Sequence, residues 1–151
     1  MKMKTYFAFL RGINVGGKRL VKMDALRSLF LELGYENAHT ILASGNIRFE
    51  AVNPTAETIE SALESSFGFS IPVTLWTLRE IQTLVESNPF SHVDISPDTK
   101  CYVTFTADRA VCSLLVLSKD RKTTDLMKEL DKEYGKRVTT RNWNTVLRLL
   151  K

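Results

Sequence analysis

The order of hydrophobic patterns in the first 77 residues limits the fold more than any other feature of the chain. Four runs of apolar and β-branched residues, at 5–10, 38–43, 47–51 and 71–77, have the length and composition of β-strands. The two stretches between them carry apolar residues at helical spacing, and each ends at a glycine suited to a helix C-terminus, Gly34 or Gly68. The residues predicted to be buried are Met23, Leu26, Leu29, Phe30 and Leu33 in the first helix, and Ile59, Ala62, Leu63 and Phe67 in the second.

These elements follow one another as β-α-β-β-α-β, which is the order of ferredoxin-like domains. Ser44-Gly45-Asn46 joins the second and third strands, because glycine and asparagine tolerate the positive φ that tight hairpins need. In such a sheet, the end of the first strand and this hairpin lie at the same edge. The order therefore predicts that residues 11–18 lie beside the Ser44-Gly45-Asn46 turn.

The second half of the chain is predicted to add an α/β hairpin-and-helix part. Thr77 and Glu80 form a capping box for a helix that ends before Pro89. A hairpin of 101–107 and 110–118, a helix over 124–134, a short extended segment and a last helix with Trp143, Val146, Leu147 and Leu150 on its apolar face then follow. We therefore expect an α+β protein with a ferredoxin-like half, 1–77, and a C-terminal half, 78–151, packed into one compact unit.

Composition and charge set broad limits on function. Of the 151 residues, 44% are hydrophobic and 25% are charged, which is typical of a globular domain. No apolar stretch approaches the roughly 20 residues of a membrane-spanning helix, and the N-terminus lacks a signal cleavage site. We therefore expect a cytoplasmic protein with no membrane partner. The net charge of +4 is compatible with an anionic partner, and equally with a solubilising excess of Lys and Arg.

The two cysteines are predicted to be free thiols. A two-residue turn at 108–109 places Cys112 opposite Phe105 and Cys101 opposite Val116, which keeps the two sulfurs apart. With two histidines in the chain and no Cys-x-x-Cys spacing, the sequence predicts no metal site and no cofactor.

The segment R-G-I-N-V-G-G-K, Arg11 to Lys18, resembles a P-loop but departs from it at the decisive position. The P-loop requires Ser or Thr after the lysine, to bind Mg²⁺, and this chain has Arg19. The predicted helix also begins later than a P-loop helix, and the sheet is antiparallel rather than parallel. Two readings remain. Either Gly12, Gly16 and Gly17 only shape a turn, or Arg11, Asn14 and Lys18 also converge on an anionic or polar ligand.

A second polar cluster, T-T-R-N-W-N-T, spans residues 139–145. Capping the last helix requires one or two of these side chains, and Trp143 is suited to anchor the helix in the core. Thr140 or Asn142 can supply this cap, so a structural role explains Arg141, Asn142 and Asn144 only in part. Because a cation at a helix N-terminus opposes the helix dipole, Arg141 suggests an acidic or anionic partner.

Three motifs, R-G-I-N-V-G-G-K, A-S-G-N-I-R-F and T-T-R-N-W-N-T, occur in this order along the chain. In these three motifs and their order, essentially the whole chain resembles the bacterial domain of unknown function (DUF) family 1697. The resemblance implies a soluble α+β protein with a ferredoxin-like N-terminal part. It implies no activity, cofactor or catalytic residue.

The first functional hypothesis is a binding site for a small anionic or polar ligand at the sheet edge formed by the R-G-I-N-V-G-G-K loop and the Ser44-Gly45-Asn46 turn. Whether it is also an enzyme is left open, because no nucleophile-base pair is recognisable and no catalytic residue is identified. The predicted ligand-binding residues are Arg11, Gly12, Asn14, Gly16, Gly17, Lys18, Ser44, Gly45, Asn46, Arg141, Asn142 and Asn144.

Two alternatives remain at this stage. The element order is also that of an RNA-recognition motif, and the chain is basic, but Ser44 and Asn46 occupy positions where stacking aromatics belong. A nucleic-acid-binding module is therefore the second hypothesis. The third is an interaction or scaffold protein without a ligand site. The sequence does not determine the oligomeric state.

Overall fold

The computed structural model of the protein describes residues 2–94, 96–106, 110–118, 121–135 and 137–151. Among these residues the fold is mixed α+β, with seven strands in two antiparallel sheets and five helices. The chain divides into two compact units, Met1–Glu80 and Ile81–Lys151. The predicted boundary between residues 77 and 78, and the packing of both halves into one unit, stay predictions.

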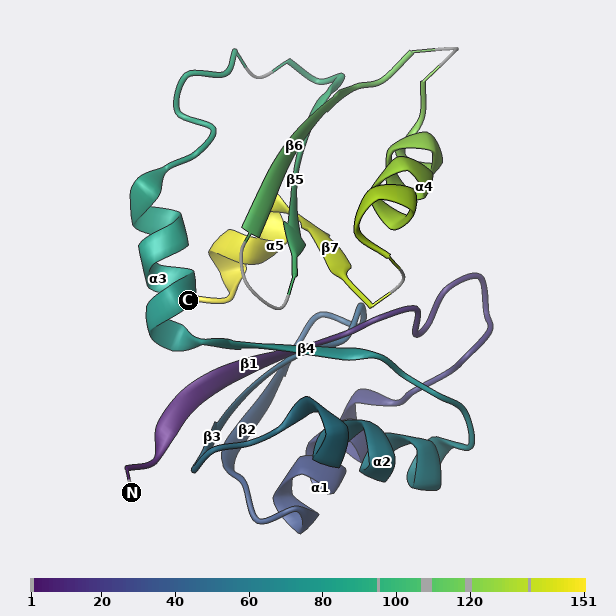
Figure 1. The fold of residues 1–151 in the computed structure, drawn as a ribbon, viewed down its shortest axis with the longest axis vertical. Helices are drawn as coiled ribbons and strands as arrows, with labels where there is room; N and C mark the ends of the chain where they lie inside the picture. Colours follow the sequence, from purple (N-terminus) through teal and green to yellow (C-terminus); the bar gives the residue numbers. More distant parts are fainter. Residues whose placement is uncertain (1, 95, 107–109, 119–120, 136) are drawn as a thin grey trace. The chain divides into compact units, whose positions relative to one another are not determined.

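The first unit follows the predicted element order. It consists of β1 (Lys4–Leu10), α1 (Met23–Glu32), β2 (Glu36–Ile41), β3 (Asn46–Ala51), α2 (Ala56–Phe67) and β4 (Val73–Thr77). The strands lie in the order β2-β3-β1-β4, and each neighbouring pair is antiparallel. Figure 1 shows α1 and α2 on one face of this sheet. The buried core includes Ala8, Leu10, Leu26, Phe30, Ile47, Phe49, Ile59 and Leu63.

Local signals explain where these elements begin and end. The hydroxyl of Thr55 accepts a hydrogen bond from the Thr58 amide at 3.2 Å and so caps α2, while Gly68 closes the helix in the left-handed conformation, φ 82°. The second strand occupies Glu36–Ile41 rather than the predicted 38–43. It ends earlier because Leu42 has a φ of 61°, which is incompatible with continued strand pairing.

The predicted capping box of α3 (Leu78–Ser87) is confirmed. The Thr77 amide donates to Glu80 Oε1 at 2.9 Å, and the Glu80 amide donates to Thr77 Oγ1 at 3.1 Å. Two N–H groups at the start of the helix are therefore satisfied by local side chains. The division between the two compact units falls inside α3, after Glu80.

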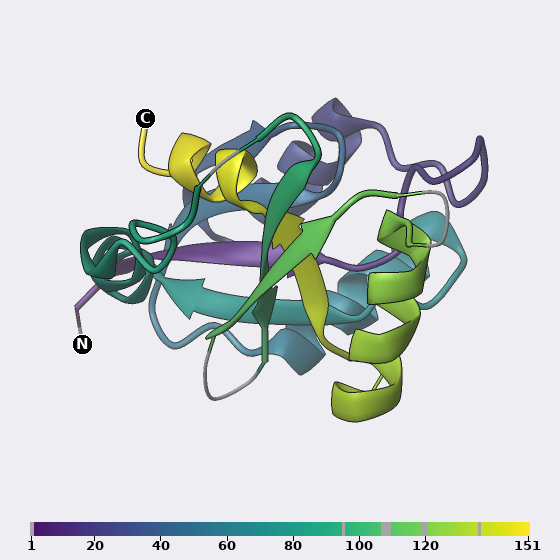
Figure 2. The ribbon, with the colours of Figure 1, turned by 90° about the horizontal axis from the view of Figure 1, so that it is seen from above.

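The second unit is built on a three-stranded sheet. Beyond α3 it contains β5 (Thr99–Phe105), β6 (Ala110–Val116), α4 (Thr123–Tyr134), β7 (Thr139–Asn142) and α5 (Trp143–Arg148). The strand order is β6-β5-β7, with β5 in the middle and both pairs antiparallel. Figure 2 shows α4 alongside this sheet. The buried side chains of Leu115, Leu126 and Leu130 pack together there, with Tyr102 against them.

The register of the β5–β6 hairpin differs from the prediction. Cys112 lies opposite Val103, and Cys101 lies opposite Leu114, because β5 ends at Phe105, opposite Ala110. The connection is therefore four residues long, and the predicted turn at Asp108-Arg109 lies outside the described residues. Each cysteine moves two positions along its partner strand, and both thiols are free.

The C-terminal helix also differs in detail from its predicted apolar face. Val146 and Leu149 are fully buried, whereas Leu147 and Leu150 are only partly buried. The difference arises because α5 is only six residues long and ends at Arg148, so a regular helical stripe does not reach Leu150. Within the described part of the chain, no helix combines the length and apolar character needed to cross a membrane.

We predict that Thr55→Ala lowers the free energy of unfolding by about 1 kcal/mol, because the first turn of α2 loses its side-chain acceptor. Urea unfolding followed by circular dichroism measures the change. Ser61→Ala, at an exposed position inside the same helix, is the matched control and should be neutral or slightly stabilising. Equal destabilisation by both variants would contradict the capping role.

Candidate functional site

The R-G-I-N-V-G-G-K segment forms a tight hairpin after β1. The Lys18 amide donates to the Val15 carbonyl at 3.0 Å, and the two residues pair as an antiparallel bridge. Gly16 and Gly17, between them, both have positive φ, at 59° and 73°. Two successive left-handed residues are the requirement of a type I′ turn, so these glycines shape the hairpin. Because α1 begins only at Met23, the turn does not lead directly into a helix, as a P-loop does.

The side chain of Asn14 ties this hairpin to its surroundings. Its Nδ2 donates to the carbonyls of Val21 at 3.0 Å and Ala43 at 2.8 Å, and its Oδ1 accepts from the Val21 amide at 2.8 Å. The Leu10 amide also donates to the Gly45 carbonyl at 2.8 Å. These bonds confirm that the hairpin lies beside the Ser44-Gly45-Asn46 turn. They also use both amide hydrogens of Asn14, which leaves it none to offer a ligand.

The Ser44-Gly45-Asn46 turn is likewise held from within. Asn46 is completely buried, and its Nδ2 donates to the Ile41 carbonyl at 2.8 Å and to Ser44 Oγ at 3.0 Å. Gly45 has a φ of 94°, and a Cβ added to it would lie 2.9 Å from Cδ1 of Ile13 and 3.0 Å from Cβ of Leu10. Only glycine fits this contact without a shift of the neighbouring core side chains.

Arg19, which stands where a P-loop has Ser or Thr, anchors the same hairpin. Its Nε donates to the Gly12 carbonyl at 2.8 Å, its Nη2 donates to the Ser70 carbonyl, and its guanidinium lies 4.6 Å from the centre of the Phe69 ring. Sequence analysis missed this role, because its partners lie 7 and 51 residues away. Of the other polar residues predicted here, Arg11 is partly buried, and Lys18 and Ser44 are exposed.

The second unit carries a cleft of about 410 Å³ where β7 ends. β7 pairs with β5 only as far as Asn142, which lies opposite Tyr102. The first three residues of β5, Thr99 to Cys101, therefore have no strand beside them on that side within the described chain. We call this space the β5–β7 cleft. It is lined by Ser96, Pro97, Thr99, Lys100, Cys101, Tyr102, Asn142, Trp143 and Asn144.

The β5–β7 cleft presents several polar hydrogens. Asn142 Oδ1 accepts from the Thr145 amide at 2.9 Å and caps α5, which leaves its Nδ2 hydrogens without a partner among the described residues. The exposed side chains of Lys100 and Asn144 also make no hydrogen bond within that part of the chain. No Asp or Glu is among the described lining residues, so the polar groups favour an acceptor-rich ligand.

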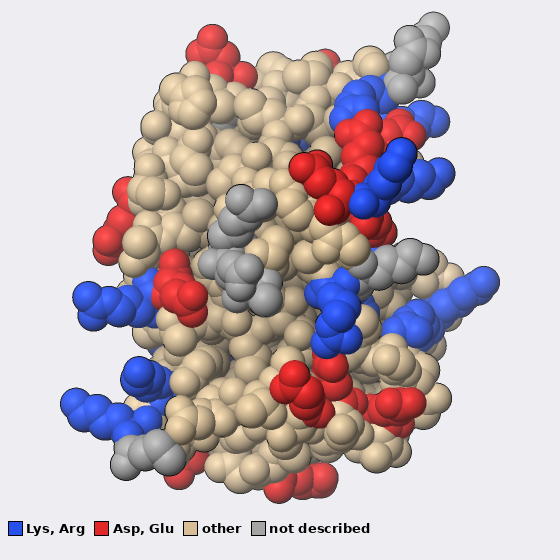
Figure 3. Space-filling model, in the orientation of Figure 1, with Lys and Arg blue, Asp and Glu red and all other residues tan. Residues whose placement is uncertain are grey.

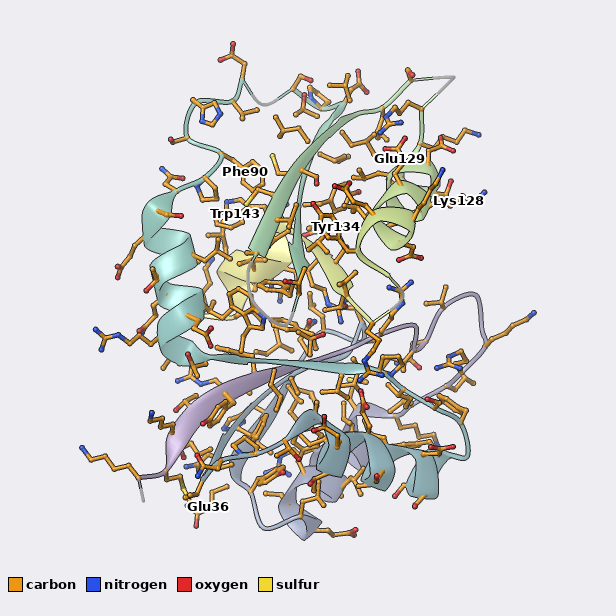
Figure 4. All side chains as sticks on the ribbon, in the orientation of Figure 1. Glu36, Phe90, Lys128, Glu129, Tyr134 and Trp143 are labelled. Atoms are coloured by element: carbon orange, nitrogen blue, oxygen red, sulfur yellow. The ribbon has the colours of Figure 1, made fainter. Side chains whose placement is uncertain are left out.

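One wall of the β5–β7 cleft is aromatic. Trp143 packs edge to face against Phe90, with ring centres 5.2 Å apart and an interplanar angle of 67°. Figure 4 shows the two side chains close together. Phe90 is almost completely buried and Trp143 is partly exposed, so the indole is held in place while part of it borders the cleft. Tyr102 Oη lies 3.1 Å from Thr123 Oγ1 and can hydrogen-bond there.

Arg141 is not among the residues that line the β5–β7 cleft. Its Nη1 donates to Thr139 Oγ1 at 2.6 Å and to the Thr140 carbonyl at 3.1 Å. Burial lowers the pKa of its guanidinium to about 10. The structure thus separates the predicted C-terminal residues: Asn142 and Asn144 line the cleft, and Arg141 binds its own strand.

Neither thiol has the lowered pKa that is typical of a nucleophilic cysteine. Burial raises the pKa of Cys101 above its ordinary value, and burial together with the charge of Cys101 does the same for Cys112. A raised pKa keeps a thiol protonated and unreactive near neutral pH. No histidine lines the cleft among the described residues, and nowhere in that part of the chain do three His, Cys, Asp or Glu side chains gather as metal ligands.

Comparison with known proteins places this chain in a family. The family model for DUF1697, described as a protein of unknown function, matches residues 3–139, and the chain belongs to that family. A conserved bacterial protein, SP0830 from Streptococcus pneumoniae, has a similar solved structure, with a TM-score of 0.74 and 21% sequence identity. The similarity covers 98% of this chain and 97% of that one, and at this identity it shows the fold alone. No curated protein matches the chain.

We predict that Gly45→Ala lowers the free energy of unfolding by roughly 3 kcal/mol, the sum of left-handed strain and crowding against Ile13 and Leu10. Gly68→Ala is the matched control. Gly68 has a similar φ of 82°, but a Cβ added there meets nothing within 4 Å, so that variant should cost only about 1 kcal/mol. Chemical denaturation of both variants measures the difference, and equal losses would contradict the close approach at Gly45.

Proposed function

We propose that this protein binds a small anionic or polar ligand in the β5–β7 cleft. The observation that carries the proposal is the lining of a space of about 410 Å³ by amide, hydroxyl and ammonium groups and an indole, without a carboxylate among the described lining residues. Small-molecule sites commonly have volumes of about 300–1,000 Å³ and combine an apolar wall with a few polar groups that fix orientation.

The polar groups favour an anion. Lys100 brings the only formal charge among the described lining residues, and the Asn142 and Asn144 amides stand beside it with hydrogens to donate. A carboxylate or phosphate accepts several such hydrogens at once, and charge-assisted bonds of this kind are the stronger ones. The indole of Trp143 suits a ligand that also has a planar or apolar part.

The sheet edge of the first unit is a weaker candidate location. Asn14 and Asn46 use their amides to hold the hairpin and the turn, and Ser44 Oγ accepts one of the bonds from Asn46, so the fold already occupies much of the polar surface that a ligand there would need. The arrangement of that unit also supports a ferredoxin-like topology, because β-α-β-β-α-β order and the antiparallel order β2-β3-β1-β4 occur together.

No observation favours the nucleic-acid alternative over this proposal. Asn46 stands where an RNA-recognition motif carries a base-stacking aromatic, and it is completely buried. The element order and the net charge of +4 are the remaining arguments. The order is shared with ferredoxin-like domains, and the charge fits a small anion equally well.

Tryptophan fluorescence tests the proposal. The chain has two tryptophans, so Trp76→Phe leaves Trp143 as the reporter beside the cleft. We predict that inorganic phosphate, citrate or adenosine monophosphate changes this emission with saturation, and that neutral glucose does not. Lys100→Ala in the same background should weaken binding about ten-fold or more, since a hydrogen bond to a charged group contributes about 1.5–3 kcal/mol.

Lys18→Ala is the matched control, because it removes an exposed lysine from the hairpin of the first unit instead. Affinity that survives Lys18→Ala and falls with Lys100→Ala or Asn144→Ala supports the β5–β7 cleft. The reverse pattern would contradict a site in the β5–β7 cleft. An unchanged signal across the whole panel would contradict ligand binding at Trp143.

A further inference from the structure

Within the described residues, the sheets of the two units have four edge strands, and three of them are protected against pairing with another chain. An exposed strand edge offers unpaired N–H and C=O groups, and proteins block such edges with bulges, charges, short strands or covering groups. Along a strand, successive residues direct their backbone N–H and C=O groups alternately toward one neighbouring strand and away from it. One known ladder hydrogen bond therefore shows which residues direct these groups outward, and we call them the outward residues.

In the first unit, side chains cover the outer edge of β4. The Arg11 amide donates to the Pro72 carbonyl on the β1 side, so the residues that point outward are Val73, Leu75 and Thr77. The Val73 amide donates to Glu60 Oε2 at 2.8 Å, and the Thr77 amide donates to Glu80 Oε1 at 2.9 Å. Two of the three outward amides of β4 are therefore already satisfied by carboxylates.

The edges at β2 and β7 are protected by other means. β2 carries the exposed Glu36, and its register shifts between Glu36 and His39, which interrupts regular pairing. β7 is only four residues long, and the guanidinium of Arg141 binds the outward carbonyl of Thr140. Neither edge offers a long, uninterrupted row of free backbone groups.

The edge at β6 has none of these protections among the described residues. β6 runs for seven residues without a register shift, and its sequence, AVCSLLV, contains no charge and no proline. The Leu117 amide donates to the Asp98 carbonyl at 2.8 Å, which sets the alternation along the hairpin. The outward residues are therefore Ala110, Cys112, Leu114 and Val116, and no side chain of the described chain binds their backbone groups.

The same four residues carry apolar side chains on one face of β6, opposite the face on which Leu115 packs against α4. Leu114 is 46% exposed and Val116 is 63% exposed, and the residue Cys112 as a whole is also exposed. Figure 3 shows charged side chains gathered over α4, whereas β6 itself, AVCSLLV, contains no charged residue. This edge thus combines free backbone groups with exposed apolar side chains.

We propose that β6 is a homodimerisation edge that pairs antiparallel with β6 of a second copy of this chain. A two-fold axis through Ser113, the middle residue of β6, lets the two strands overlap along their whole length. In this register the outward Cys112 exchanges hydrogen bonds with the partner subunit's Leu114, and Ala110 does so with the partner subunit's Val116. In this register, each outward N–H and C=O group of one strand faces an outward C=O or N–H group of the other strand. A neutral strand also meets its own copy without charge repulsion, which favours a second copy of the chain as the partner. The result is one six-stranded sheet across two subunits.

Light scattering coupled to size-exclusion chromatography, over a series of protein concentrations, tests this proposal. The expected mass is twice the 17.2 kDa of one chain. Leu114→Lys should return the protein to one chain mass, because the new charges would lie close to the two-fold axis. Leu31→Lys, a substitution at a residue of similar exposure (41%) on α1, should leave the dimer intact. If Leu114→Lys fails to fold by circular dichroism, Val116→Lys replaces it.

Amide hydrogen exchange by NMR separates strand pairing from simple apolar contact. In the dimer, the amides of Cys112 and Leu114 should become protected with rising concentration, whereas those of Ser113 and Leu115, already bonded to β5, should not change. Three results would overturn the proposal: a single chain mass at every concentration, a dimer unaffected by lysine in β6, or a mass that grows beyond two chains.

Discussion

The arrangement of the first unit's sheet edge depends on the hydrogen bonds of the Asn14 carboxamide. β1 ends at Leu10 and α1 begins at Met23, so the chain between them has no continuous ladder to satisfy its backbone groups. Asn14 supplies three hydrogen bonds that join the hairpin to Val21 and Ala43. Gly45 then permits the close approach of the turn to Ile13. The polar and glycine residues of this edge are therefore part of the fold, whether or not a ligand binds there.

In the second unit, β7 is shorter than β5 and β6, and this difference accounts for both the β5–β7 cleft and the long edge at β6. β5 and β6 are seven residues long and pair along their whole length, whereas β7 has four residues. Because β7 stops early, the first residues of β5 are left open and the β5–β7 cleft forms beside them. On the other side of β5, the full-length β6 forms a long outer edge. A sheet of two long strands and one short strand thus has a short, covered edge at β7 and a long, apolar one at β6.

Much of the fold could be predicted from local sequence patterns. The strand and helix order of the first unit, the capping box of Thr77 and Glu80, the end of α2 at Gly68, and the proximity of the R-G-I-N-V-G-G-K loop to Ser44-Gly45-Asn46 all agree with the structure. The register of the β5–β6 hairpin could not be predicted, since it depends on a connection two residues longer than the turn chosen from composition. The candidate site was predicted in part, because Asn142 and Asn144 line the cleft while Lys100 and Thr99 carried no sequence signal.

By itself the sequence determined the type and order of the elements, because helical periodicity, capping and glycine stops act between residues no more than a few positions apart. Only the tertiary structure decided which polar side chains use their hydrogen-bonding groups to hold the fold together. Asn14 and Asn142 look alike in the sequence, but Asn14 finds a carbonyl 29 residues away, whereas Asn142 caps its own helix and keeps its Nδ2 facing no described partner. The physical reason is that a hydrogen bond needs its partner within about 3 Å, and only the folded chain brings distant backbone groups that close.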